Sequence, residues 1–176
     1  MTDVFTAPRV HHPDEYGPLP ARRTDAVVLA VADARRTARH YATALAMRCT
    51  AYSGPETGNP ETVSYVLESG GARFVITSVV RQLTEHGRRI AAHVAVHGDS
   101  ILDLTVEVPD AYAAYDYAVD RGAAALREPY ELSDRYGTVV LAVIGTAGTR
   151  HTLVERTAYA GLYLPGYGTP PAGVLL

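Results

Sequence analysis

The sequence predicts an α+β protein in which two βαβββ modules pair their sheets into a cup, with the helices outside. Two observations support this. A strand-like run, an aspartate and an amphipathic helix occur in that order twice, and the strings VADA (31–34) and VPDA (108–111) mark the two starts, 77 residues apart. Further strand-like segments follow each helix. One such unit would leave a face of its sheet uncovered, whereas two units can cover each other.

The first module begins with the apolar run 26–31, which is typical of a buried strand. Asp33 is the expected helix N-cap, because its side chain can accept a hydrogen bond from the first turn. Apolar residues then recur at helical spacing (Ala34, Ala38, Tyr41, Ala42 and Leu45). Glycine and proline predict a loop over 53–61, followed by strands at 62–68 and 72–78. Residues 84–97 are predicted to be helical.

The second module repeats this order. A strand is predicted at 101–108, Asp110 is the expected N-cap, and Gly122 is the expected helix stop. Apolar residues between them lie on one helix face (Ala111, Tyr115, Ala118 and Val119). Further strands are expected at 124–127, 138–144 and 150–155.

The predicted domain organisation follows from the repeat. Residues 1–21 are rich in proline and lack any period, so we expect an N-terminal arm. Residues 22–167 form a single domain, with module one at 22–98 and module two at 99–160. Residues 168–176 form a tail.

Composition narrows the functional classes. Hydrophobic residues make up 47% of the 176 residues and charged residues 20%, as in a globular protein. With 16 basic and 19 acidic residues and no basic stripe, the chain is not expected to bind nucleic acid. Cys49 is the only cysteine, so no internal disulfide can form. The first residues have no secretory pattern and no stretch is typical of a membrane span, so we expect a cytoplasmic protein without membrane contact.

Several local strings resemble one family. They are ETGNPETVSYVLESGGARFVITS (56–78), VHGDSILDLTVEV (96–108), GAAALREPYE (122–131), GTVVLAVIGTAGTRHTLVER (137–156) and YLPGY (163–167). Together they resemble the N-terminal half of 4-hydroxyphenylpyruvate dioxygenase and of its sister enzyme 4-hydroxymandelate synthase, in the vicinal oxygen chelate superfamily. The resemblance covers about residues 22–167. Ser100 stands where the family more often has glycine, and Tyr130 where tryptophan or phenylalanine is usual.

The resemblance implies a fold and a chemistry. The superfamily is built from paired βαβββ modules, and the enzymes are non-haem iron dioxygenases that oxidatively decarboxylate a 4-hydroxyphenyl 2-oxo acid. Their Fe(II) site, two histidines and one glutamate, belongs to the C-terminal half, whereas only nine residues follow YLPGY here. We therefore expect the chain to correspond to the metal-free half, with no cofactor of its own. Whether it is itself an enzyme is left open.

The repeat also allows a test for a metal site. In the superfamily, metal ligands lie on the first strand of each module and at the end of its last strand. Applying the 77-residue offset gives Ala26, Ser78, Asp103 and Glu155 as the equivalent positions. None is an imidazole, and two carboxylates suit Mg²⁺ or Ca²⁺ better than iron. We expect no metal and no catalytic residue, with a weak site at Asp103 and Glu155 as the alternative.

Polar residues are the candidates for the lining of the cup. Strand alternation places Asp103, Thr105 and Glu107 on one face of their strand, and His151 and Glu155 on one face of theirs. If these faces line the cup, its interior is polar and wet. Buried acids need partners. The expected partners are the arginines Arg73, Arg150 and Arg156.

Two other groups are weighed against a structural role. His93 and His97 lie at i, i+4 spacing and could hold zinc with Glu85 or His86, but we favour ordering of the loop at 97–99. Cys49 is expected to be a small core residue rather than a nucleophile, because no base can be placed beside it.

Three functions remain open. The first is half of an oxygenase, acting with an iron-bearing C-terminal half. The second is a metal-free homodimeric module that binds a small aromatic metabolite or antibiotic in its cup. The third, a small metal-dependent enzyme using Asp103 and Glu155, is the least favoured because imidazole ligands are lacking. The expected partners are therefore another copy of this chain, an iron-bearing half or a small aromatic ligand.

Overall fold

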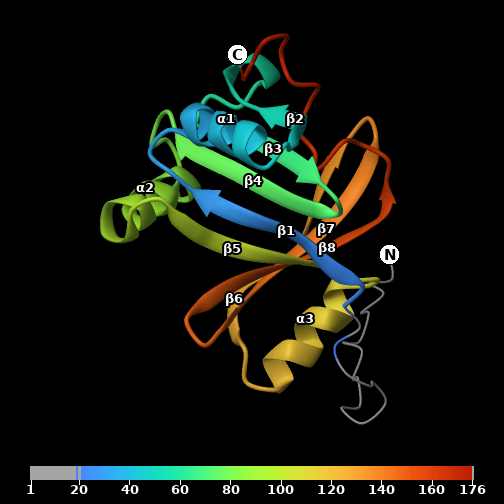
Figure 1. Ribbon diagram of the computed structural model, residues 1–176. Helices are drawn as coiled ribbons and strands as arrows, with labels where there is room; N and C mark the ends of the chain where they lie inside the picture. Colours follow the sequence, from blue (N-terminus) through green and yellow to red (C-terminus); the bar gives the residue numbers. More distant parts are fainter. Residues whose placement is uncertain (1–18, 20, 176) are drawn as a thin grey trace, which may run out of the picture.

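The computed structural model describes residues 19 and 21–175, which form one twisted eight-stranded sheet with three α-helices (Figure 1). The arm predicted at 1–21 lies almost wholly outside the described residues. None of the described helices is long and apolar enough to cross a membrane. The predicted α+β class, with two βαβββ modules, is confirmed.

The first module supplies four strands and one helix. In chain order they are β1 (Arg23–Ala30), α1 (Ala34–Ala44), β2 (Arg48–Ser53), β3 (Thr62–Ser69) and β4 (Ala72–Val79). A short 3-10 helix, Pro55–Thr57, lies within the predicted loop. The βαβββ plan implied the edge strand β2, but no range was predicted for it, because its sequence RCTAYS shows no clear alternation of apolar and polar residues.

A linking helix and the second module follow. They are α2 (Glu85–His97), β5 (Ser100–Glu107), α3 (Ala111–Asp120), β6 (Ala124–Asp134), β7 (Gly137–Thr146) and β8 (Thr149–Tyr159). The helix predicted at 84–97 is confirmed as α2. The strand predicted at 124–127 is much longer, because β6 pairs with β7 along its whole length.

The 77-residue repeat is preserved in the strand register. In module one, Val27 of β1 pairs with Phe74 of β4 in parallel, and in module two Leu104 of β5 pairs with His151 of β8. The strand order is β2-β3-β4-β1-β5-β8-β7-β6, and β1 and β5 meet antiparallel in the middle. Exchanging the two modules leaves this order unchanged, so the sheet has an approximate twofold axis between β1 and β5.

The helix ends follow the predicted capping. The Asp33 carboxylate accepts a hydrogen bond of 3.0 Å from the Arg36 backbone N–H at the start of α1. Asp110 does the same for Ala113 in α3, at 2.9 Å. Gly122 follows α3 with a φ of 93°, a left-handed conformation that glycine adopts without strain.

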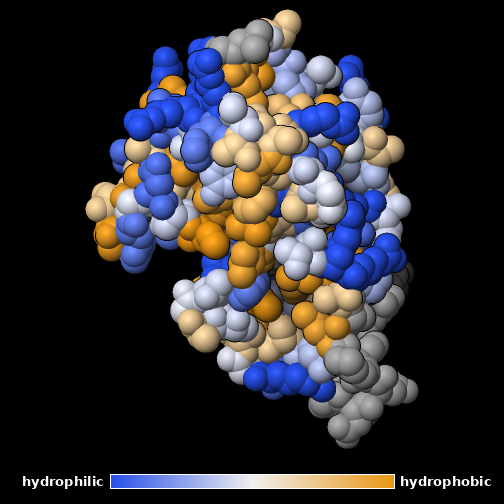
Figure 2. Space-filling view, in the orientation of Figure 1, coloured by the Kyte–Doolittle hydropathy of each residue, from blue (hydrophilic) through white to orange (hydrophobic). Residues whose placement is uncertain are grey.

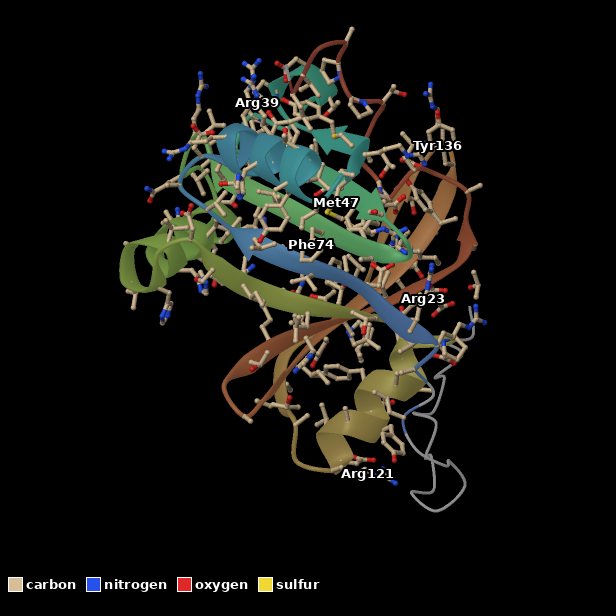
Figure 3. The ribbon with its side chains drawn as sticks, viewed as in Figure 1. Arg23, Arg39, Met47, Phe74, Arg121 and Tyr136 are labelled. Atoms are coloured by element: carbon tan, nitrogen blue, oxygen red, sulfur yellow. The ribbon has the colours of Figure 1, made fainter. Side chains whose placement is uncertain are left out.

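Helices α1 and α3 cover the outer face of the sheet, one on each module. Beneath α1, Leu67 and Ile76 are fully buried, and burial of such a side chain contributes roughly 1.5–3 kcal/mol. Figure 3 shows Met47 and Phe74 on this side of the sheet, while Arg39 extends from α1 into solvent. The inner face, opposite these helices, is therefore the face available for a site.

Cys49 packs at the edge of the cluster beneath α1 and is half-buried. Burial raises the pKa of its thiol to about 11. The thiol is therefore protonated at neutral pH, so Cys49 is a poor nucleophile there.

Candidate functional site

The inner face of the sheet lines a partly open cavity of about 370 Å³, which we call the cup cavity. Strands of both modules line it, together with α2 and residues 163–167. In Figure 2 the outline of the molecule is notched between α2 and the turn joining β7 to β8. The cavity is thus bounded by elements that are distant in sequence.

Residues 160–168, which we call the strap, close one side of the cup. They leave the end of β8 and return to module one, where Tyr52 and Gly168 exchange backbone hydrogen bonds of 3.0 and 2.8 Å. Tyr163 of the strap is buried against Ala26 and Val75 on the inner face. The strap therefore ties the last strand of module two to the first module.

Asp25 forms the most deeply buried ion-pair network of the described residues. Its side chain is fully buried, and its carboxylate lies 2.6 Å from Arg73 Nη1 and 2.6 Å from Arg156 Nη2. Thr105 donates a hydrogen bond of 3.2 Å to the same carboxylate. A register shift between Thr24 and Ala26 marks a β-bulge, which lets Asp25 reach these partners while Ala26 packs inside the cup.

The ring of Tyr163 is close to both arginines of this network. The guanidinium carbons of Arg73 and Arg156 are 5.4 and 4.9 Å from its ring centroid. Arg156 also donates to the Tyr163 backbone oxygen. Burial raises the pKa of the Tyr163 hydroxyl, which therefore stays protonated. The network holds the strap against β1, β4 and β8.

Asp103 lies inside the cup cavity and is also nearly fully buried. Its carboxylate accepts hydrogen bonds from Arg150 Nε at 3.0 Å, from Thr152 N at 2.9 Å and from the Thr152 hydroxyl at 2.5 Å. Burial raises its pKa, and these donors oppose that effect. Both carboxylate oxygens are thus engaged by the protein.

Positive charge gathers at the rim of the cavity. Arg89 of α2, Arg127 of β6 and Arg150 of β8 line it, and the Arg127 guanidinium stacks 3.4 Å from the Tyr130 ring centroid. His86 is solvent-exposed but closely surrounded by protein atoms. This partial desolvation and the charge of Arg89 lower the pKa of His86.

Glu61 fixes α2 as a wall of the cavity. Its carboxylate accepts hydrogen bonds from the Thr84 backbone N–H at 2.6 Å and from the Thr84 hydroxyl at 2.8 Å. The backbone hydrogen bond lowers the pKa of Glu61. A side chain at Gly87 would lie 2.4 Å from a Glu61 oxygen, so the glycine permits this close approach.

The structure places the first three cup candidates as follows. Asp103 and Thr105 line the cavity. Glu107 does not: it lies at the end of β5, where its carboxylate pairs with Arg23 at 2.8 Å. Among the expected arginine partners, Arg150 binds Asp103, whereas Arg73 and Arg156 bind Asp25.

The placement of His151 and Glu155 in the cup was wrong, because both lie on the outer face. Leu153 lies between His151 and Glu155 on the same face of β8 and is buried in the cluster beneath α3. Ile144, the partner of His151 on β7, is buried in the same cluster. Glu155 accepts a hydrogen bond of 3.0 Å from the Ala111 backbone N–H at the first turn of α3. Alternation shows which residues share a face, but a strand covered on both faces does not show which face is inward.

Replacing Glu155 by alanine should therefore affect stability. The first turn of α3 loses a carboxylate acceptor near its positive end, and we expect the free energy of unfolding to fall by about 1 kcal/mol. Denaturant unfolding of the variant checks this, with Glu131→Ala, an exposed glutamate on β6, as the control. Unchanged stability together with loss of divalent-metal binding would instead indicate a ligand role.

The residues present do not fit the family's iron site. Of the four equivalent positions, Ala26 and Asp103 face the cup, while Ser78 and Glu155 lie on the outer face. The inward residues next to the latter two are Thr77 and Val154, neither of which is an imidazole. Within residues 19 and 21–175 no group of three or more His, Cys, Asp or Glu side chains is arranged to hold a metal ion.

The contacts of His93 and His97 favour a structural role over the zinc site considered on α2. His93 Nε2 lies 2.9 Å from the Ser100 hydroxyl at the start of β5, and the His93 and His97 rings are 4.8 Å apart. Asp99 accepts a hydrogen bond of 2.7 Å from the Ala32 backbone N–H. These contacts order the loop that leads into β5.

Comparison with curated proteins shows where related sequences occur. No family model matches the chain. It is 37% identical over 138 residues to 4-hydroxyphenylpyruvate dioxygenase of Yarrowia lipolytica, covering 78% of this chain and 35% of that protein. The corresponding enzyme of Dictyostelium discoideum is 35% identical over 145 residues, with coverage of 81% and 39%. The chain thus spans well under half the length of these relatives.

Solved structures give the same picture. A mutant of 4-hydroxymandelate synthase from Streptomyces coelicolor matches with a TM-score of 0.72 and 30% identity, over 87% of this chain and 43% of that chain. Methylmalonyl-CoA epimerase from Mycobacterium tuberculosis matches with a TM-score of 0.61 and 18% identity, over 82% of this chain and 95% of that chain. At this low identity the match shows a shared fold and nothing about function. This chain is therefore a homologue of the 4-hydroxyphenylpyruvate dioxygenase and 4-hydroxymandelate synthase family that corresponds to one half of its members, and it has the vicinal oxygen chelate fold.

Proposed function

We propose that this chain provides the metal-free half of a 4-hydroxyphenylpyruvate dioxygenase-like oxygenase and does not catalyse the family reaction by itself. The main support is that the homologous stretch accounts for 35% to 40% of the length of the curated relatives. On this proposal the chain corresponds to the N-terminal half, and Fe(II) binds to the C-terminal half. That half is supplied by a continuation of the polypeptide or by a second chain.

The side chains that line the cup support the assignment of Fe(II) to the other half. A non-haem oxygenase needs two imidazoles and a carboxylate, with open positions for oxygen and substrate. The carboxylate in this cup, Asp103, is instead held by Arg150 and Thr152. The role left to this half is structural: it supports the iron-bearing half, contributes oligomer contacts and closes the entrance to the active site.

Iron content and oxygen uptake test this proposal. The 176-residue chain is incubated anaerobically with Fe(II), desalted and assayed with 4-hydroxyphenylpyruvate for bound iron and for O₂ consumption. We expect iron well below one per chain and no substrate-dependent uptake. A full-length relative whose homologous half is replaced by this chain is the positive arm, and it should bind iron. Stoichiometric iron in the isolated chain, with turnover, would contradict the proposal.

The cavity on the inner face favours a second candidate, a module that binds a small molecule without metal. Methylmalonyl-CoA epimerase shows that a protein can consist almost entirely of this fold, since the match covers 95% of its chain. A second copy of this chain is then the expected partner. This function requires only that the cup binds a ligand, whether or not an iron-bearing half is attached.

A further inference from the structure

We propose that the cup cavity binds a small aromatic carboxylate, with the carboxylate against the arginines at the rim and the ring between the apolar walls. This proposal rests on the second candidate function above and names its ligand class. It does not depend on iron or on a second half.

The first support is unbalanced charge. Three arginines line the cavity, Arg89, Arg127 and Arg150, against one carboxylate, that of Asp103. Arg150 contacts Asp103 through Nε, and its two Nη groups have no partner among residues 19 and 21–175. A guanidinium with free N–H groups matches the geometry of a carboxylate, which it can bind with two hydrogen bonds.

The second support is how these cations are held. They come from α2, β6 and β8, so the fold brings together charges that lie far apart in the sequence. Both Arg89 and Arg150 line this one cavity, and burial and the charge of Arg150 lower the pKa of Arg89. Arg127 is held by stacking on Tyr130. Like charges held close repel, and an anion bound between them relieves that repulsion.

The third support is the chemistry of the remaining lining. The same cavity is lined by aliphatic side chains, including Val28, Leu141 and Leu164. On module one, the Ser64 hydroxyl donates to Thr77 at 2.8 Å, and Asn59 donates to the Ser53 hydroxyl at 3.2 Å. Charged, apolar and hydrogen-bonding groups in one cavity suit a ring that carries a carboxylate and a hydrogen-bonding group. The volume of about 370 Å³ lies within the usual range for ligand pockets, about 300–1,000 Å³.

Calorimetric titration of the 176-residue chain at low salt tests the proposal, with 4-hydroxyphenylacetate and phenylacetate as probes. Phenylacetamide is the uncharged analogue, acetate lacks the ring, and inorganic phosphate reports non-specific anion binding. We expect both aromatic acids to bind, and phenylacetamide to bind roughly tenfold to a hundredfold more weakly, because a hydrogen-bonded charge is lost. Acetate and phosphate should bind more weakly than phenylacetate.

Matched variants locate the site. Arg150→Gln and Arg89→Gln should each weaken phenylacetate binding roughly tenfold or more. Arg88→Gln removes the neighbouring charge on α2, which does not line the cavity, and should leave binding unchanged. Thermal unfolding of each variant confirms that it is folded.

Four results would overturn the proposal. Three are no binding of either aromatic acid, equal binding of phenylacetate and phenylacetamide, and equal loss of affinity in Arg88→Gln and Arg150→Gln. The fourth is phosphate binding as tightly as phenylacetate, which would show only a cationic surface. None of these results changes the iron assay, so this proposal can fail while the oxygenase-half proposal stands.

Discussion

Replacing Asp25 by alanine should lower the free energy of unfolding by about 3–5 kcal/mol, because removing one partner of a buried ion pair leaves the others uncompensated. Here two arginines, Arg73 and Arg156, would lose their shared carboxylate in a place where their side chains are mostly buried. For a chain of this length the melting temperature should fall by about 6–20 °C. Urea denaturation followed by circular dichroism gives the free energy directly.

Two further variants separate charge from shape at this site. Asp25→Asn keeps the volume and some hydrogen bonds but removes the charge, so its loss should be smaller than that of Asp25→Ala. Asp116→Ala removes an exposed carboxylate on α3 and should change stability by no more than about 0.5 kcal/mol. If Asp25→Ala is no worse than Asp116→Ala, the Asp25 network does not stabilise the fold as argued.

Truncating Tyr163 to alanine should also cost about 3–5 kcal/mol, the range for removing a large aromatic side chain from a core. Tyr163 is 4% exposed and its ring is close to both Arg73 and Arg156, so its loss leaves a cavity and removes both cation–π contacts. Hydrogen exchange should also speed up at Gly168, whose backbone N–H bonds to Tyr52, because the strap is no longer anchored.

Tyr163→Phe is the matched control for this prediction. It keeps the ring and therefore the packing and the cation–π contacts, so its destabilisation should stay below about 1 kcal/mol. Chemical denaturation of both variants, with exchange measured by mass spectrometry, gives the comparison. Equal losses in the two variants would mean that the hydroxyl, rather than the ring, holds the strap.

Features set by local sequence were predictable here. The caps Asp33 and Asp110, the amphipathic helices behind them and the 77-residue spacing all depend on neighbours along the chain. Together they were enough to predict two βαβββ modules. The register of β1 with β4 and of β5 with β8 then follows the same offset, because both modules fold in the same way.

Features set by distant partners were not predictable. Asp25 binds arginines 48 and 131 positions away in the sequence, and no local pattern indicates such a pair. The bulge at Asp25 further breaks the alternation on which face assignments depend. For Glu155 one signal was available: Leu153, on the same face, is a typical core residue, and it indicated packing beneath a helix rather than a wet cup.

The approximate twofold symmetry of the sheet has a consequence for orientation. A cup built from two identical modules would offer any occupant two equivalent poses, related by a half-turn. Here the equivalent inner positions differ, with Ala26 and Val28 on one side matched by Asp103 and Thr105 on the other. The half-turn therefore exchanges unlike walls and the two poses have different energies. The difference between the two modules thus gives the interior a polarity, and a small molecule bound there would favour one direction over the other.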